Sequence, residues 1–155
     1  QMFIEQVCNQ LANHQVPYAV VGGHAVALHG AVRGTVDLDL VIRWSEINLE
    51  NTEKALKELG LVSRLPLSAN EVFKYRDQYV KERNLIAWNF YNPGRLDEQV
   101  DLTINYDLGD EESVRKQTAS GTIEIIPLVS LIKMKRASGR PQDLIDIKAL
   151  ENLKA

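Results

Sequence analysis

The sequence predicts an α/β (α+β) protein in which helices flank a mixed β-sheet. Two observations support this fold class. Short apolar runs typical of buried strands alternate along the chain with segments whose apolar residues recur every three or four positions, as in amphipathic helices. Glycine or proline residues interrupt the pattern at most of the boundaries between these segments. Such an order favours a sheet with helices packed on it.

The first half of the chain contains four predicted helices and two predicted strands. Apolar residues at 3, 4, 7, 8, 11 and 12 indicate the first helix. Residues 68–71 have the sequence of a helix capping box. In chain order we expect a helix over 3–12, a strand over 18–21, a helix over 24–29, a strand over 36–42, a helix over 51–59, and a helix from 68 to about 81 with Val72, Tyr75 and Tyr79 facing inward.

The second half contains three predicted strands and two predicted helices. Asn92-Pro93-Gly94 is a turn sequence between the first two strands. For Trp88 and Phe90, which share a strand face, core packing is the expectation and a base-stacking platform the alternative. We expect strands over 85–91 and 99–104, an optional helix before residue 121, a strand over 121–126, and helices over 128–137 and from 141 to about 153.

Length and composition indicate one domain over residues 1–155, with 45% hydrophobic and 25% charged residues. No apolar run approaches the ~20 residues of a membrane helix, and the opening segment lacks the basic start of a signal peptide. The single Cys8 lies in an apolar periodic segment, which predicts a buried thiol. We therefore expect a cytoplasmic protein without a membrane partner. The net charge of −3 makes a long nucleic-acid partner a weaker expectation than a small polyanion.

Asp37 and Asp39 are the candidate metal ligands of the predicted strand over 36–42. Residues two apart in a strand point the same way, so the two carboxylates share a face, about 7 Å apart along the chain. Leu38 and Leu40 then face a core. Two ionised acids side by side repel each other, and such a pair usually protonates or binds a cation.

Asp101 is a third candidate acid, because it alternates with the apolar residues Val100 and Leu102. If its strand pairs with the strand of Asp39, three carboxylates converge. Oxygen ligands of this kind suit Mg²⁺, and two such ions can hold the attacking and leaving oxygens of a phosphoryl displacement. The alternative is that the D-x-D pattern is accidental and Asp101 ends a strand.

Phosphate contacts are predicted upstream of the acids. Gly22 and Gly23 precede a short helix, where backbone N–H groups can approach a phosphate without a Cβ in the way. Arg33 and Thr35 could contact phosphate through charge and hydroxyl. The alternatives are an ordinary turn and a surface loop.

Lys135 and Arg140 are candidate cations for a triphosphate, with Asp143 and Asp146 orienting them by ion pairing. An equally weighted alternative is that these charges only complement the dipoles of their helices. His24 and His29 do not have the spacing of a helical zinc pair, so we expect both to be structural.

The segment G-G-H-A followed by R-G-T-V-D-L-D-L-V-I resembles the nucleotidyltransferase superfamily, which has the polymerase-β-like fold. Asp101 matches the third acid of that superfamily. Lys135 with G-R-P-Q-D-L-I-D is similar to a C-terminal helical motif of small bacterial members, including AbiEii-type toxin-like proteins and antibiotic nucleotidyltransferases. The resemblance extends from about Val20 to Leu150. The second turn position is often Ser in the superfamily but is Gly23 here, so we expect a hydroxyl contact to phosphate either to be absent or to come from Thr35.

The resemblance implies transfer of a nucleoside monophosphate from an NTP to an acceptor hydroxyl. Gly22 and Gly23 would hold the phosphates, Asp37 and Asp39 would bind two Mg²⁺ ions, and Asp101 would complete one metal site and help deprotonate the acceptor. The expected acceptor is a protein or small molecule, RNA being less favoured, and its binding site is expected on another chain, a homodimer partner or a further segment. The alternatives are a non-catalytic nucleotide-binding regulatory module of a toxin–antitoxin-like system, or a structural domain with accidental motifs.

Overall fold

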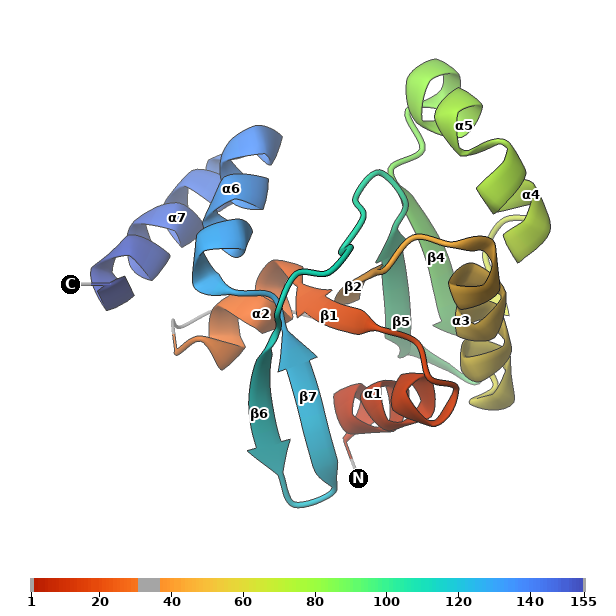
Figure 1. The fold of residues 1–155 in the computed structure, drawn as a ribbon, viewed down its shortest axis with the longest axis horizontal. Helices are drawn as coiled ribbons and strands as arrows, with labels where there is room; N and C mark the ends of the chain where they lie inside the picture. Colours follow the sequence, from red (N-terminus) through yellow and green to blue (C-terminus); the bar gives the residue numbers. More distant parts are fainter. Residues whose placement is uncertain (1, 31–36, 155) are drawn as a thin grey trace.

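The computed structural model describes residues 2–30 and 37–154, whose strands form one seven-stranded mixed sheet (Figure 1). The strand order is β3-β4-β5-β2-β1-β7-β6. β2 pairs in parallel with β5, β1 pairs in parallel with β7, and the other neighbours are antiparallel. The predicted fold class is therefore confirmed. The strands are β1 (Tyr18–Val21), β2 (Leu38–Ile42), β3 (Val62–Ser63), β4 (Ala87–Asn92), β5 (Arg95–Thr103), β6 (Val114–Thr118) and β7 (Gly121–Ile125).

Helices lie on both sides of the central strands. α1 packs against β7 and α3, and α3 packs against α4, whereas α2 contacts β1 and β2. α6 and α7 pack together at the opposite end of the molecule from α4 and α5 (Figure 1). None of the helices in the described part of the chain combines the length and apolarity needed to cross a membrane. The helices are α1 (Phe3–Asn13), α2 (Gly22–Leu28), α3 (Glu46–Glu58), α4 (Ala69–Lys74), α5 (Arg76–Arg83), α6 (Leu128–Ser138) and α7 (Pro141–Lys154).

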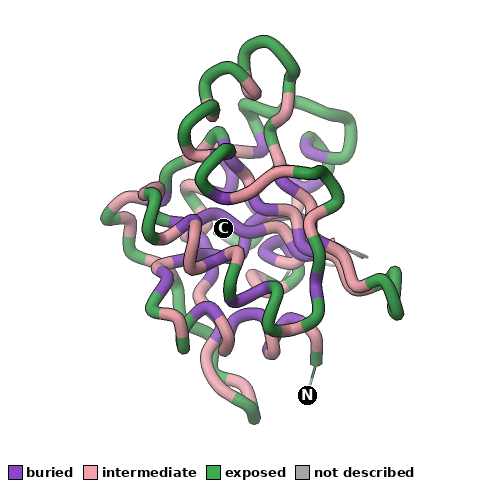
Figure 2. Tube along the Cα trace, turned by 90° about the vertical axis from the view of Figure 1, so that its right-hand side faces the viewer, coloured by how far each residue is buried: buried purple, intermediate pink, exposed green. Residues whose placement is uncertain are grey.

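The hydrophobic core contains most residues of the central strands and the inner faces of the helices, and Figure 2 shows buried segments running through the interior of the molecule. Leu38 and Leu40 are buried, as alternation along the strand predicts. Trp88 and Phe90 are also buried, with ring centroids 4.6 Å apart, so the expectation of core packing is confirmed. Cys8 is buried as well, which confirms the predicted thiol environment.

Two helix predictions differ from the structure for local reasons. α3 begins at Glu46, five residues before the predicted start, because the side chain of Ser45 accepts a hydrogen bond from the backbone N–H of Asn48 and caps the helix. The predicted capping box at Ser68 is present, but the helix that it starts is interrupted at Tyr75 and continues as α5. The Tyr75 side chain is exposed, so its predicted inward orientation is wrong.

The segment before β7 also differs from its prediction. The optional helix is wrong, because β6 lies there and pairs with β7 as an antiparallel hairpin. β6 is an edge strand whose residues are mostly exposed, and its polar sequence, V-R-K-Q-T, lacks the apolar pattern from which a strand would be predicted. The short β3 likewise had no predicted counterpart.

Candidate functional site

The three candidate acids converge where β2 and β5 run side by side. Asp39 in β2 and Asp101 in β5 are register partners in the parallel ladder, which confirms the pairing on which the three-acid hypothesis depended. Asp37 lies immediately before β2, which begins at Leu38, rather than inside the strand as predicted. All three acidic residues are partly exposed, whereas Leu38 is buried. The acids therefore lie on the face of the sheet opposite the core.

The environment of Asp39 opposes its ionisation. Burial raises its pKa to about 7, and the negative charges of Asp101 and Asp37 contribute to the rise. The positive charges of Lys135 and Arg140 act in the opposite direction. Those two cations are therefore close enough to Asp39 to lower its pKa.

The pKa of Asp37 is shifted in the same direction as that of Asp39. Burial raises its pKa, and Asp101 adds to the rise, whereas the charges of Arg64 and His24 lower it. His24 thus lies near the acids. His29 instead makes a contact of 2.8 Å between its Nε2 and the carbonyl oxygen of Ile126, which fits the structural role expected for it.

Gly22 is required by the position of Asp39. Its φ of +66° lies in the left-handed region, and a Cβ at this position would overlap the Oδ2 atom of the Asp39 carboxylate. Val21 pairs with Asp39 across the antiparallel ladder, so the end of β1 directly faces the acid. The glycine therefore makes room for the carboxylate, a steric requirement separate from any contact with phosphate. Gly23 is buried at the start of α2.

Lys135 is the centre of a buried ionic cluster between α6 and α7. Its Nζ lies 3.2 Å from Oδ1 of Asp143 and 3.0 Å from Oδ2 of Asp146, and all three side chains are at least 94% buried. Arg140 is exposed, and its Nε donates to Oδ2 of Asp143 at 2.9 Å. The predicted ion pairing of these residues is confirmed. Their contact with a triphosphate stays a prediction.

Hydrogen bonds keep Asp143 ionised. Burial alone would raise its pKa, but hydrogen bonds from Arg140, Ser138 and Lys135 outweigh that effect and hold the pKa well below its usual range. The backbone N–H of Arg140 also donates to Asp143, at 3.1 Å, at the start of α7. An acid in the first turn of a helix is favourable, so the dipole interpretation also applies here.

A polar network that the sequence patterns did not predict binds Asp101 from β4. Nδ2 of Asn89 donates to Oδ1 of Asp101 at 2.7 Å, and Nε of Arg64 donates to Oδ1 of Asn89 at 2.8 Å. The guanidinium of Arg64 also stacks on the ring of Tyr91, 4.5 Å from its centroid. The sequence contained one usable indication: Asn89 alternates with the core residues Trp88 and Phe90, and so faces away from the core.

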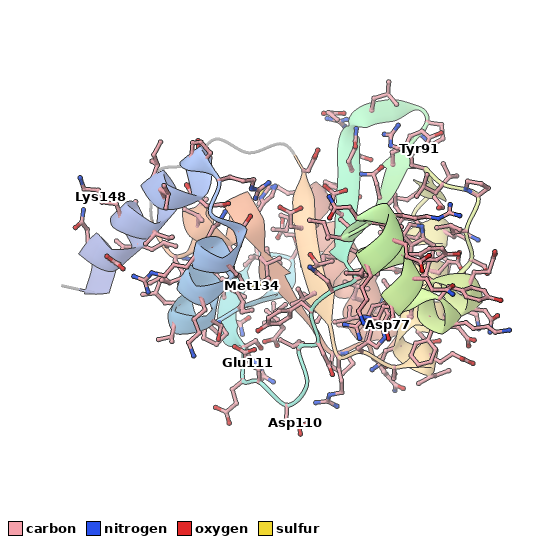
Figure 3. The ribbon with its side chains drawn as sticks, turned by 90° about the horizontal axis from the view of Figure 1, so that it is seen from above. Asp77, Tyr91, Asp110, Glu111, Met134 and Lys148 are labelled. Carbon is pink, nitrogen blue, oxygen red and sulfur yellow. The ribbon has the colours of Figure 1, made fainter. Side chains whose placement is uncertain are left out.

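The site has cations on two flanks. In Figure 3, α6 and α7 lie on one side of β1 and β2, and the β4–β5 hairpin with Tyr91 lies on the other. Lys135 and Arg140 belong to the first flank, and Arg64 is bound to the second. Arg33 and Thr35, the other predicted phosphate ligands, fall outside the described residues.

A divalent cation fits the chemistry of the three acids. Within residues 2–30 and 37–154, no three His, Cys, Asp or Glu side chains are already arranged around a metal position. The acids nevertheless offer only oxygen donors, which suits Mg²⁺. Burial and then the repulsion of the neighbouring acids raise the pKa of Asp37 and Asp39, and a bound cation would relieve that repulsion.

Comparison with known proteins gives matches at the level of structure. No family model matches the sequence, and no curated protein does so at a significant level. An antigenic nucleotidyltransferase-like protein from Paracoccidioides brasiliensis has a TM-score of 0.61 at 18% identity, over 97% of this chain and 74% of its own. The lincomycin-bound lincosamide adenylyltransferase LnuA has a TM-score of 0.59 at 12% identity, over 94% and 92%. ANT(2'')-Ia in complex with adenylyl-2''-tobramycin has a TM-score of 0.57 at 13% identity, over 97% and 90%.

Proposed function

Since the chain has the fold of the nucleotidyltransferases, we propose that it transfers a nucleoside monophosphate from an NTP to an acceptor hydroxyl and releases pyrophosphate. The observation that supports this most directly is the register pairing of Asp39 with Asp101, with Asp37 beside them. Among accidental D-x-D sequences, few would have a third acid directly opposite on a parallel neighbour. We also keep the prediction that residues 1–155 form one nucleotidyltransferase domain.

In the proposed reaction the acceptor oxygen attacks the α-phosphorus, and the bond from that phosphorus to the bridging oxygen breaks. Asp37 and Asp39 would hold two Mg²⁺ ions, and Asp101 would complete one of the sites. When bound, the ions stabilise the charge that develops on the attacking and leaving oxygens. Asp101 would accept the proton of the acceptor hydroxyl. Gly22 and Gly23 would present backbone N–H groups to the phosphates.

The cations on the α6 and α7 flank support a position for the triphosphate. Arg140 is exposed and close enough to Asp39 to influence its charge, so it can contact a phosphate directly. Lys135 is buried between two carboxylates, and its contribution is mainly to the local field. Asp143 orients both cations. Arg33 and Thr35 remain proposed ligands by sequence alone.

The acceptor is proposed to be a small molecule or a protein side chain. Two of the structural neighbours were solved with lincomycin and with adenylyl-2''-tobramycin, which are small molecules. Because α6 and α7 lie on one flank of the central strands in Figure 3, we propose that the acceptor approaches the acids from the β4–β5 side. A homodimer partner is a further proposed source of acceptor contacts.

The test is a thermal-shift panel with the four NTPs, each with and without Mg²⁺, together with an assay of pyrophosphate release. We expect one or more NTPs to raise the Tm only when Mg²⁺ is present. Asp39→Asn should remove that increase and the release of pyrophosphate, because the amide cannot supply a negative oxygen ligand. Asp110→Asn is the matched control, since Asp110 is exposed and, among the described residues, forms an ion pair only with Arg43.

Unchanged pyrophosphate release in both Asp37→Asn and Asp39→Asn would contradict the proposal. A Tm increase with Mg²⁺ and NTP, without transfer to any acceptor, would favour the non-catalytic regulatory module instead. No stabilisation by any NTP would favour a structural domain.

A further inference from the structure

One carboxylate oxygen of Asp101 already accepts a hydrogen bond from a protein side chain. Its Oδ1 accepts a hydrogen bond of 2.7 Å from Nδ2 of Asn89, which is its register partner across the antiparallel β4–β5 ladder. Opposite side chains of such a ladder are about 5 Å apart, so the contact results from the strand register itself. Among the hydrogen bonds of the described residues, this one uses Oδ1 of Asp101 and leaves the second oxygen, Oδ2, for a further ligand.

The orientation of the Asn89 amide is fixed by its other neighbours. Arg64 has only donors, so the oxygen of the amide must face its Nε, at 2.8 Å, and the nitrogen must face Asp101. Gln99 accepts from both, at 3.2 Å from Nδ2 of Asn89 and 3.4 Å from Nη2 of Arg64. A donor held in this way does not rotate freely, and the carboxylate that it binds is restrained in turn.

The network is held from outside the site. The Arg64 guanidinium stacks on Tyr91, and the backbone N–H of Arg64 donates to the carbonyl oxygen of Asn89 at 3.0 Å. Thus β3 and its following residue, at the edge of the sheet, are connected through two hydrogen bonds to the acid at its centre. Asn89 itself is only partly exposed.

We propose that Asn89 is a positioning residue for Asp101, with Arg64 and Gln99 holding its amide so that Oδ2 of Asp101 is the oxygen offered to the cation. This inference rests on the proposed function, because it gives the geometry of one of the proposed ligands. Groups that orient metal ligands typically change metal affinity or activity 10–100-fold when removed. A residue with a purely structural role would lower stability without such a change.

The same hairpin supplies a matched control. Nδ2 of Asn92 donates to Oε1 of Glu98 at 2.9 Å, again an asparagine on β4 bound to a carboxylate on β5. Glu98 is not one of the converging acids. Asn92→Ala therefore removes a comparable asparagine–carboxylate hydrogen bond from the same hairpin, together with the hydrogen bond from the backbone N–H of Gly94, without touching Asp101.

The experiment measures Mn²⁺ binding by electron paramagnetic resonance in the whole chain, for Asn89→Ala, Asn92→Ala, Asp101→Asn and the double variant Asn89→Ala/Asp101→Asn. We expect Asn89→Ala to raise the Kd for Mn²⁺ about tenfold and Asn92→Ala to leave it within about twofold. In the Asp101→Asn background Asn89→Ala should have no further effect, because it acts through that acid. Asn89→Leu, which keeps the volume of the side chain, serves if Asn89→Ala does not fold.

Each other outcome contradicts a different claim. If Asp101→Asn weakens Mn²⁺ binding but Asn89→Ala and Asn89→Leu do not, the positioning role is wrong and the proposed metal site stands. If Asn89→Ala has the same effect with and without Asp101, its role is structural. If Asp101→Asn binds Mn²⁺ as the wild type does, the metal role proposed for Asp101 is itself wrong.

Discussion

Gly22 and Asp39 show how single residues adapt a buried sheet to hold an acid. The carboxylate lies where a Cβ of residue 22 would be, and the backbone at residue 22 has a positive φ that side chains rarely tolerate. Steric and conformational requirements therefore coincide at one position. A substitution there should disturb the fold and the acid together.

We predict that Gly22→Ala destabilises the protein more than Gly60→Ala does. Gly60 also has a positive φ, of +85°, but no atom lies within 4 Å of a Cβ placed there, so it measures backbone strain alone. That strain is roughly 1–2 kcal/mol. The overlap with Asp39 should add about 1–3 kcal/mol, as overpacking does elsewhere. Urea unfolding of the two variants measures the difference, and equal losses would show that Asp39 moves aside without cost.

The sequence predicted the three acids because alternation along a strand depends only on neighbouring residues. It could not predict Arg64 and Asn89 as part of the site, since their contact joins segments far apart in the chain. It also could not predict that Lys135 is buried. A lysine with two acids nearby in sequence has the same pattern whether the cluster faces water or lies between helices.

At the scale of elements, α6 and α7 are joined by charge as well as by apolar packing. Lys135 extends from α6 to Asp143 and Asp146 of α7, out of contact with solvent. Removal of one partner of a buried ion pair leaves an uncompensated charge. Here it would remove the cation that Asp143 and Asp146 share, while Arg140 would still pair with Asp143.

Lys135→Met should therefore reduce the free energy of unfolding by about 3–5 kcal/mol at neutral pH. Arg136→Met is the control, because the pair of Arg136 with Glu151 is exposed and should contribute less than about 1 kcal/mol. Chemical denaturation at pH 7 gives both values. A loss for Lys135→Met no larger than that of the control would mean that the carboxylates protonate or separate without penalty.

Some helix and strand boundaries can be predicted from neighbouring residues alone, and others cannot. Strand Tyr18–Val21 has the predicted bounds, since Pro17 and Gly22 limit it on both sides. The break at Tyr75 divides a segment whose apolar periodicity is continuous. Arg76 donates from Nε to the carbonyl oxygen of Ile104 at 2.5 Å and lies over the ring of Trp44, contacts that no local pattern reveals.

At the scale of the whole molecule, Cys8 reports on the integrity of the core. It is fully buried, and burial raises the pKa of its thiol to about 11. The thiolate is the reactive form, so both the lack of access and the raised pKa suppress alkylation in the folded state.

We predict that iodoacetamide labels Cys8 at pH 8 at least about a hundredfold more slowly in the native protein than in urea, where the thiol pKa is about 8.5. The labelling rate should increase with denaturant as global opening becomes more frequent. Cys8→Ala, which removes the only cysteine, provides the blank. Fast labelling in buffer would show that α1 opens independently of the sheet.

The sequence also predicted the mixed sheet, but not the order of its strands. That order depends on which strands meet after long connections, and a single sequence contains little information about such pairings. The three-acid hypothesis required only that the strands of Asp39 and Asp101 pair, and β2 and β5 do pair, in parallel.

The same alignment has a consequence for folding. α3, β3, α4, α5 and β4 all lie between β2 and β5 in the chain, so Asp39 and Asp101 can meet only after a long loop has closed. Closure of a long loop is entropically unfavourable, and contacts distant in sequence form slowly. The proposed metal ligands therefore assemble late, and a nascent chain that has not yet paired β5 has only part of the site.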